Sequence, residues 1–187
     1  MNTGQMMLTI GALILLGTTV FTVNSNSLNQ GTILRQTEIG IYAVSLATSY
    51  IQKAMSLAFD EKTNTRPTLP VNAVPSAYLT APPLGIDAAY GEIANRDSTF
   101  DDFDDYNNYS KDTLITNVDD FKVGAIVYYI QNIGDAQPYA QTNTPTWLKR
   151  MDVCVWSSIS RKVFEDPNAA IDKGTDTIKI SYIKSYY

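Results

Sequence analysis

The distribution of charge along the chain restricts its fold more than any other feature of the sequence. The first charged side chain is Arg35, and everything before it is neutral apart from the terminal amine. Within that stretch, residues 6–23 (MMLTIGALILLGTTVFTV) contain nothing more polar than threonine and glycine. A helix of about 20 such residues spans the hydrocarbon core of a bilayer. The sequence therefore predicts an apolar segment over residues 1–25 that lipid or neighbouring helices must cover.

A cleaved secretory signal is the main alternative for this segment. Signal peptides begin with basic residues and end at a small-residue cleavage site of the Ala-x-Ala type. The opening MNTGQ contains no lysine or arginine, and no such site clearly follows the apolar run. A retained helix is therefore the expectation.

A second helical pattern follows the apolar segment. From Ile33 to Ala58 apolar residues recur at three- and four-residue steps, and no proline occurs before Pro67. A helix over residues 5–61 would measure on the order of 85 Å, far more than a compact domain of this size needs. We therefore expect an α+β protein with a long projecting N-terminal helix over residues 1–61, apolar in its first half and amphipathic in its second.

The polar stretch between the two helical halves predicts a local break. Residues 24–32 (NSNSLNQGT) are rich in asparagine, serine and glycine. These residues compete with the helix through side-chain bonds to the backbone, or weaken it entropically. A kink or a melted turn is expected there.

The rest of the chain, residues 62–187, predicts a β-rich domain. Residues 121–131 (FKVGAIVYYIQ) are almost continuously apolar, as in a central strand covered on both faces. Residues 147–158 predict a second strand, with Met151, Val153 and Val155 on one face and Asp152, Cys154 and Trp156 on the other. In residues 177–182 apolar and polar residues alternate, as in a terminal strand with one solvent-exposed face. The apolar Ile183 breaks this alternation, which predicts a change of register there.

The turn signals between these strands favour an antiparallel sheet. They are Ile133-Gly134-Asp135 with Pro138 and Pro145, then Asp166-Pro167-Asn168 and Lys173-Gly174-Thr175. One face of that sheet should pack on the amphipathic half of the helix, which explains why this half has an apolar stripe.

A proline-rich connection is expected over residues 63–95. Five of the eight prolines lie there, so regular structure is improbable. The single cysteine, Cys154, cannot form an intramolecular disulfide, and its apolar strand context predicts a small buried residue. The twelve tyrosines suit either subunit contacts or an ordinary β surface.

An acidic segment over residues 97–112 has two interpretations. In the first, oxygen atoms of Asp101, Asp102, Asp104, Asp105 and Asn107 bind calcium, a hard cation that takes six to eight oxygen ligands. The spacing lacks the EF-hand frame. In the second, the segment is a solvated loop whose aromatic residues Phe100, Phe103 and Tyr106 pack on the core. Asn108-Tyr109-Ser110 is an N-x-S sequon, which makes Asn108 a possible glycosylation site.

The composition excludes several functional classes. The net charge is -5, so attraction to nucleic acid is not expected. The chain contains no histidine, which removes the commonest general base and the commonest zinc ligand. No nucleophile–base pair, phosphate loop or metal cluster supports an enzyme. Paired carboxylates are also found in glycosidases, but no surrounding cleft signature accompanies them here.

The arrangement of a charge-poor N-terminal helix followed by a β-rich domain resembles the type IV pilins and pseudopilins. The resemblance covers residues 1–61 by pattern and the rest by general layout. It implies a homopolymer: a structural subunit that sits in the inner membrane before assembly and in the core of an extracellular filament afterwards. The residues expected at the helix contacts of that core are Met1, Gln5, Met6, Leu8, Ile10, Gly11, Leu13, Leu15, Gly17, Val20 and Phe21.

The sequence departs from this family at two points. The family usually has a glutamate at the fifth mature position, thought to pair with a neighbour's terminal amine, whereas Gln5 stands there if Met1 is the mature first residue. The basic leader that the prepilin peptidase removes is not seen, so the mature chain is expected to begin at Met1, or at Gln5 after a minimal leader MNTG.

Two alternatives to a filament subunit remain at this point. One is a plain single-pass anchor that carries an exposed domain. The other is a membrane-anchored domain that binds an extracytoplasmic ligand in a calcium-dependent manner. Whether a filament would serve adhesion, motility or secretion is not encoded in any motif of the sequence.

Overall fold

A computed structural model describes residues 3–64, 74–116, 118–132, 134, 139–157 and 177–186. The chain divides into two compact units, one ending at Ile41 and the other beginning at Tyr42. Met1, Pro67 and Pro70, the predicted turns at 166–168 and 173–175, and most of the turn at 133–138 lie outside the described residues.

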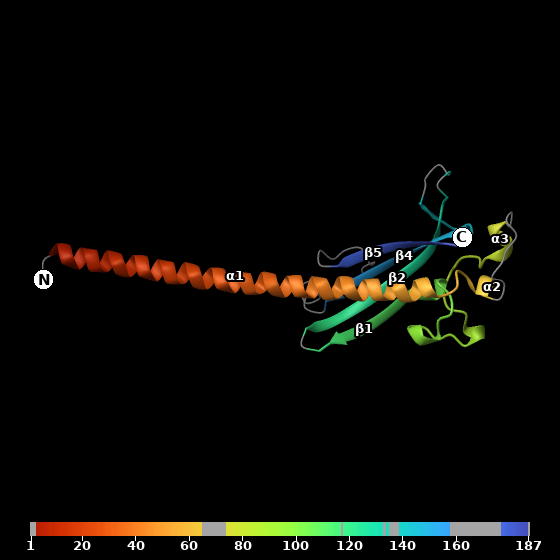
Figure 1. Ribbon diagram of the computed structural model, residues 1–187, viewed down its shortest axis with the longest axis horizontal. Coiled ribbons are helices and arrows are strands. Elements are labelled where there is room, and N and C mark those ends of the chain that lie inside the picture. The colour runs from red at the N-terminus through yellow and green to blue at the C-terminus, as the bar shows by residue number, and fades with distance from the viewer. Residues whose placement is uncertain are drawn as a thin grey trace. The chain divides into compact units, whose positions relative to one another are not determined.

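A single helix, α1 (Thr3–Ser56), accounts for most of the predicted helical region (Figure 1). It ends five residues before the predicted boundary at residue 61, and Glu61 instead begins the separate short helix α2 (Glu61–Asn64). The helix is unbroken through residues 24–32, so the predicted melted turn is wrong. The weak helix formers there cost about 0.5 kcal/mol each. That penalty is smaller than the free energy that would be lost if several backbone hydrogen bonds of the helix were broken. The hydroxyl of Thr32 is also satisfied within the helix, because it donates to the carbonyl of Leu28 at 3.1 Å.

The second unit contains the last turns of α1 and an antiparallel sheet. Its strands are β1 (Tyr109–Ile115), β2 (Asp119–Ile130), β3 (Gln141–Thr142), β4 (Leu148–Ser157) and β5 (Ile178–Ser185). They are ordered β1-β2-β4-β5, with β3 pairing an end of β2. The three predicted strands correspond to β2, β4 and β5, and β2 is central as expected. Strand β1 was not predicted.

Short helices connect α1 to the sheet. They are α2 (Glu61–Asn64), α3 (Pro75–Tyr78), η1 (Ala88–Tyr90), η2 (Asp97–Thr99) and η3 (Asp104–Tyr106). None exceeds four residues, which agrees with the absence of longer elements expected from the prolines.

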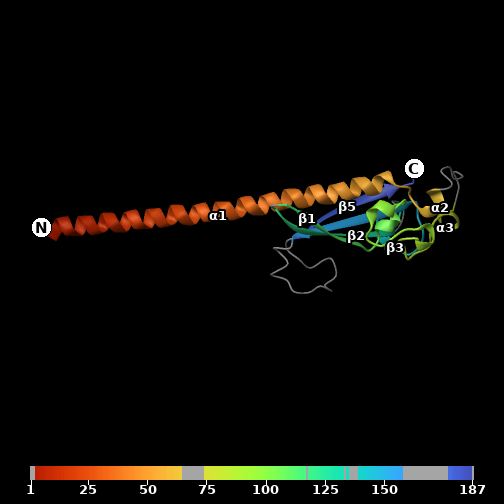
Figure 2. The same cartoon turned by 90° about the horizontal axis from the view of Figure 1, so that it is seen from below.

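The core lies between one sheet face and the end of α1 (Figures 1 and 2). The helix contributes small, aliphatic and aromatic residues at helical spacing: Ala43, Ala47, Tyr50, Ile51 and Ala54. The facing sheet residues are Val123, Ala125, Val127, Met151, Val153 and Val155, all buried. The hydroxyl of Tyr109 in β1 donates to that of Tyr50 at 3.3 Å, which ties the sheet edge to the helix.

The other sheet face is less covered than expected. Cys154 is fully buried there, as predicted, but Ile126 and Tyr128 of the central strand are half-buried. Asp152 holds this face together, because it accepts hydrogen bonds from the hydroxyl of Tyr128 at 2.9 Å and from Nε of Arg150 at 2.8 Å.

Strand β5 does not slip at Ile183. It keeps its register against β4 from Ile178↔Val155 to Ser185↔Leu148, and inward and outward positions alternate throughout. Continuation of the strand places Lys184 on the face that meets α1. There its ammonium donates to the carbonyls of Leu57, at 2.5 Å, and Ala58, at 3.1 Å.

Candidate functional site

The first unit presents apolar side chains on every side of a helix. Leu13, Ile14, Leu15 and Leu16 are consecutive, so at 100° per residue they cover most of the circumference, and each is at least 61% exposed. The same holds for the predicted contact residues Met6, Leu8, Ile10, Val20 and Phe21, which are all exposed. The helix has an 18-residue window of mean hydropathy 2.1, long and apolar enough to cross a membrane.

The threonines of this segment are compatible with an apolar environment. Thr18 and Thr19 both donate to the carbonyl of Leu15, at 2.9 and 2.7 Å, and Thr22 donates to the carbonyl of Thr18 at 2.8 Å. Thr9 bonds in the same way to the carbonyl of Met6. Each hydroxyl is thereby satisfied within the helix, as lipid or a helix bundle requires.

Gly11 and Gly17 pack against nothing else in the part of the chain that the structure describes. A Cβ atom built on either residue would meet nothing within 4 Å. Glycine in a helix costs about 1 kcal/mol relative to alanine. Small residues allow the backbone of a second helix to approach closely, and this is the contact predicted at these positions. Gln5 is likewise exposed on the same helix.

Exposed apolar residues continue past the apolar segment 6–23. Leu34 and Ile41 are 70% and 65% exposed, and Val44 and Met55 remain partly exposed although they lie in the second unit. The predicted amphipathic stripe therefore packs on the sheet from Ala43 onward, and its earlier members have no cover within the described chain.

The predicted calcium residues mainly build their own turn. Oδ1 of Asp102 accepts the backbone N–H of Asp104 at 2.7 Å, and Oδ2 of Asp105 accepts the backbone N–H groups of Asp101 and Asp102. The side chain of Asn107 links the proline-rich connection to strand β2. Its Nδ2 donates to the carbonyl of Leu84 at 2.8 Å, and its Oδ1 accepts the N–H of Val127 at 3.0 Å.

The loop is not the solvated one considered above. Asp102, Asp104 and Asp105 are each 2% exposed. The three aromatic residues predicted to pack on the core, Phe100, Phe103 and Tyr106, are indeed buried. Burial, together with the neighbouring Asp104, raises the pKa of Asp102 well above its ordinary value.

A buried ion cluster, which the sequence analysis missed, joins this loop to the end of α1. Nζ of Lys149 donates to Oδ2 of Asp60 at 2.9 Å, to Oδ1 of Asp104 and to the carbonyl of Phe59. Burial alone would raise the pKa of Asp60. The charge of Lys149 and the hydrogen bonds from Lys149 and Thr80 outweigh it and hold that pKa below its usual range.

Asp101 lies in a different carboxylate group. Its carboxylate and those of Glu61 and Glu92 each place one oxygen within 4.8 Å of the other two. Burial, followed by the negative charges of Asp101, Glu92 and Asp87, raises the pKa of Glu61 to about 7. Burial, with Glu92 beside it, raises the pKa of Asp105 to about 8.

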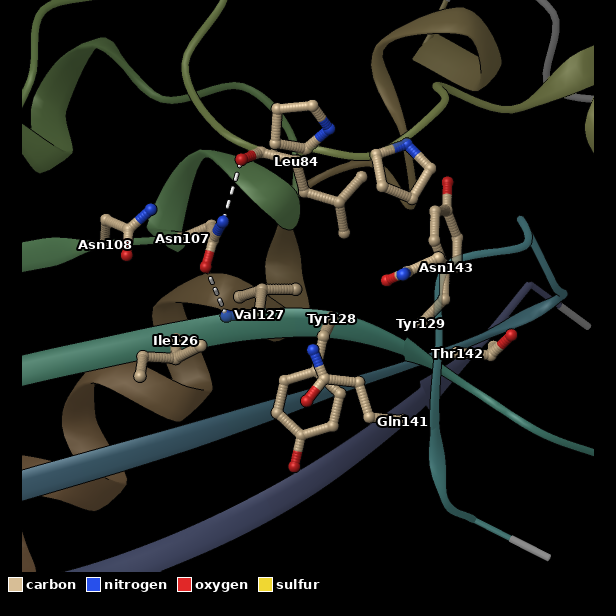
Figure 3. Close-up of a pocket in the computed structure, with 12 residues that line it drawn as sticks. Leu84, Asn107, Asn108, Ile126, Val127, Tyr128, Tyr129, Gln141, Thr142 and Asn143 are labelled. Carbon is tan, nitrogen blue, oxygen red and sulfur yellow. Dashed lines mark hydrogen bonds between the residues drawn. The ribbon is translucent and has the colours of Figure 1, made fainter. Parts of the chain in front are cut away.

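A pocket of about 540 Å³ opens beside the acidic loop (Figure 3). It is lined by Pro82, Pro83 and Leu84 of the connection, Asn107, Asn108, residues 126–129 of β2, and Gln141, Thr142 and Asn143. These side chains offer amide and hydroxyl groups and aromatic surface, and none of them is charged. The predicted glycosylation residue Asn108 lies at this pocket and is exposed, with a left-handed φ of 60°.

Comparison with family models, with curated proteins and with solved structures finds no match to this chain.

Proposed function

We propose that this chain is a structural subunit of an extracellular filament similar to type IV pili. In this proposal the N-terminal helix is inserted in the membrane before assembly. It then moves into a bundle with identical helices, while the β domain forms the outer surface. The observation that carries the proposal is the exposure of apolar side chains around the whole of the helix from Met6 to Val23.

The exposed residues beyond Val23 favour a helix bundle over a simple anchor. Ile41 follows Val23 by 18 residues, which is about 27 Å along the helix. About 20 residues suffice to cross a bilayer core, so Leu34 and Ile41 lie past the hydrocarbon when residues 6–23 occupy it. Lipid cannot cover them there, whereas a neighbouring helix can.

Transfer from membrane to bundle exchanges one apolar environment for another. The hydrophobic effect contributes little to such a step, so close packing decides the gain. The exposed glycines Gly11 and Gly17 provide that close packing in this proposal. Gln5 is uncharged, and it supplies a hydrogen-bonding amide in place of the charge that a glutamate would bring to the helix contact.

Electron microscopy of the native protein, sheared from its own cells and paired with an intact mass, tests the proposal. We expect uniform filaments composed of one mass. Single particles that require detergent would contradict the filament and would favour a membrane-anchored domain, with the 540 Å³ pocket as its binding surface.

A cysteine crosslink in cells provides a second test. Cys154 is buried, so Leu13→Cys introduces a single accessible thiol into the apolar helix. Oxidation should give covalent dimers if the helices bundle. Leu114→Cys, at an exposed position of β1, is the matched control and should give fewer dimers. Equal yields from the two variants would contradict a helix-centred contact.

A further inference from the structure

Three acidic side chains from separate parts of the connection meet near the end of α1. Glu61 begins α2, Glu92 follows η1, and Asp101 precedes η3. Their carboxylate oxygens lie within 4.8 Å of one another. Within the described part of the chain no ion pair reaches any of the three.

The carboxylate of Glu92 is buried without a neighbouring cation among the described residues. The residue is 6% exposed, and its Oε2 accepts the backbone N–H of Asp87 at 2.5 Å. Its other oxygen, Oε1, is buried and accepts no hydrogen bond from an N–H or hydroxyl group of the described residues, and the same is true of Oε2 of Glu61. The groups beside them are other carboxyls, Asp105 next to Glu92 and Asp101 next to Glu61. A buried oxygen without a partner loses its hydration and gains nothing in exchange.

We propose that Glu61, Glu92 and Asp101 bind one calcium ion. A chain without histidine, whose one cysteine is buried in β4, offers this position oxygen ligands alone, which suit hard cations. Calcium fits better than magnesium, because magnesium keeps several waters and usually takes one or two carboxylates. Backbone carbonyls and water would complete the six to eight ligands of calcium.

The neighbouring residues hold Asp101 in place. Nδ2 of Asn64 donates to Oδ2 of Asp101 at 3.1 Å, and the backbone N–H of Asp101 donates to Oδ2 of Asp105 at 3.0 Å. The carbonyl of Asp101 accepts the N–H of Ala58 at 3.1 Å. The ion would therefore fasten the segment that leaves α1 to the acidic loop.

This site differs from the one predicted from the sequence. Of the five residues proposed there, Asp101 is shared, and the other four bond within the loop or to Lys149, Leu84 and Val127. The proposal is independent of filament assembly, since all three ligands belong to the second unit.

Calorimetric titration of the full-length chain in detergent, stripped with a chelator and desalted, tests the site. We expect calcium chloride to bind at one ion per chain, with a Kd between about 10⁻⁵ and 10⁻³ M. Magnesium chloride should bind at least tenfold more weakly. Glu92→Gln and Asp101→Asn should each weaken calcium binding at least tenfold, whereas Asp112→Asn, an exposed carboxylate on β1, should leave it unchanged.

Tryptophan fluorescence of each variant shows whether the sheet is intact. If Glu92→Gln does not fold, the exposed Asp101→Asn carries the test. If titration of the intact wild-type chain with calcium up to millimolar concentration gives only heats of dilution, the proposal is overturned. Wild-type affinity in a folded Asp101→Asn variant would also overturn it, and equal binding of magnesium would overturn the assignment to calcium.

Discussion

Lys149 and Lys184 are cross-strand partners in β4 and β5; the side chain of Lys184 reaches the end of α1, and that of Lys149 reaches the residues that follow it. Lys149 binds the carbonyl of Phe59 and the carboxylate of Asp60, and Nζ of Lys184 lies within 3.4 Å of four carbonyl oxygens between Ala54 and Ala58. A helix leaves its last carbonyls unpaired and partly negative, so cations are favourable there. The two lysines attach α1 to the sheet.

We expect Lys149→Met to destabilise the second unit by about 3–5 kcal/mol, because Asp60 and Asp104 would be left buried without their cation. Denaturant unfolding in detergent, followed by the fluorescence of Trp147 and Trp156, measures this. The triple variant with Asp60→Asn and Asp104→Asn should recover part of the loss. A cost below about 1 kcal/mol for the single variant would show that the cluster is not required.

A smaller effect is expected from Lys184→Met. Its ammonium has carbonyl partners and no paired carboxylate, so removal leaves neutral acceptors and costs about 1–2 kcal/mol. The same unfolding experiment applies, with Lys62→Met as control, because Nζ of Lys62 bonds a single carbonyl, that of Leu79. A loss as large as that of Lys149→Met would contradict this ranking.

Stability without divalent cations should fall as the pH rises from about 5 to 8. The folded chain keeps a proton on Glu61, whose pKa is raised from 4.5 to about 7, while the unfolded chain releases it. The free energy of unfolding therefore decreases across this window. Asp105 contributes with the same sign. Asp60, with a lowered pKa, acts in the opposite direction and mainly in acid.

Glu61→Gln isolates the contribution of this residue. Unfolding in a chelating buffer at pH 5 and pH 8 should show a smaller difference for the variant than for the wild type, because glutamine does not titrate. A difference equal to that of the wild type would assign the pH dependence to other groups.

The periodic part of the fold was predictable from the sequence. Apolar spacing identified α1 and the strands β2, β4 and β5, because these elements bury continuous or alternating apolar residues. Strand β1 was not predicted, because its residues Ser110, Lys111, Asp112 and Thr113 resemble a polar loop. The strand is stabilised by its backbone pairing with β2 and not by an apolar pattern of its own. The melted turn was expected because propensity was weighed without the cooperativity of a long helix.

The buried charges were less predictable. Lys149 shares its strand phase with Met151, and Lys184 shares its phase with Tyr182, so both could have been recognised as inward-facing. Their acidic and carbonyl partners could not, because these lie far away in the sequence. For the same reason Glu61 and Glu92 gave no signal. They meet through an irregular, proline-rich connection whose path no periodicity describes.

Leu15→Lys should abolish filament assembly in cells. A lysine at the centre of an apolar helix costs roughly 2.5–3.5 kcal/mol in lipid, and in a bundle it also leaves a buried charge without a partner. The count of sheared filaments measures the effect. Leu114→Lys, on the exposed face of β1, serves as the control and should assemble. Intact filaments from Leu15→Lys would refute the bundle.

Ile41→Asp separates a filament subunit from a plain membrane anchor. Ile41 is exposed and lies past the segment that crosses the bilayer, so aspartate there should leave membrane insertion unchanged. In a helix bundle it would place a charge against a neighbouring helix, and we expect at least a tenfold loss of sheared filaments with a normal membrane fraction. Gln36→Asp makes the same charge change at an exposed polar position and controls for helix propensity. If both variants assemble as the wild type does, Ile41 does not contact another subunit, and a simple membrane anchor accounts for the helix equally well.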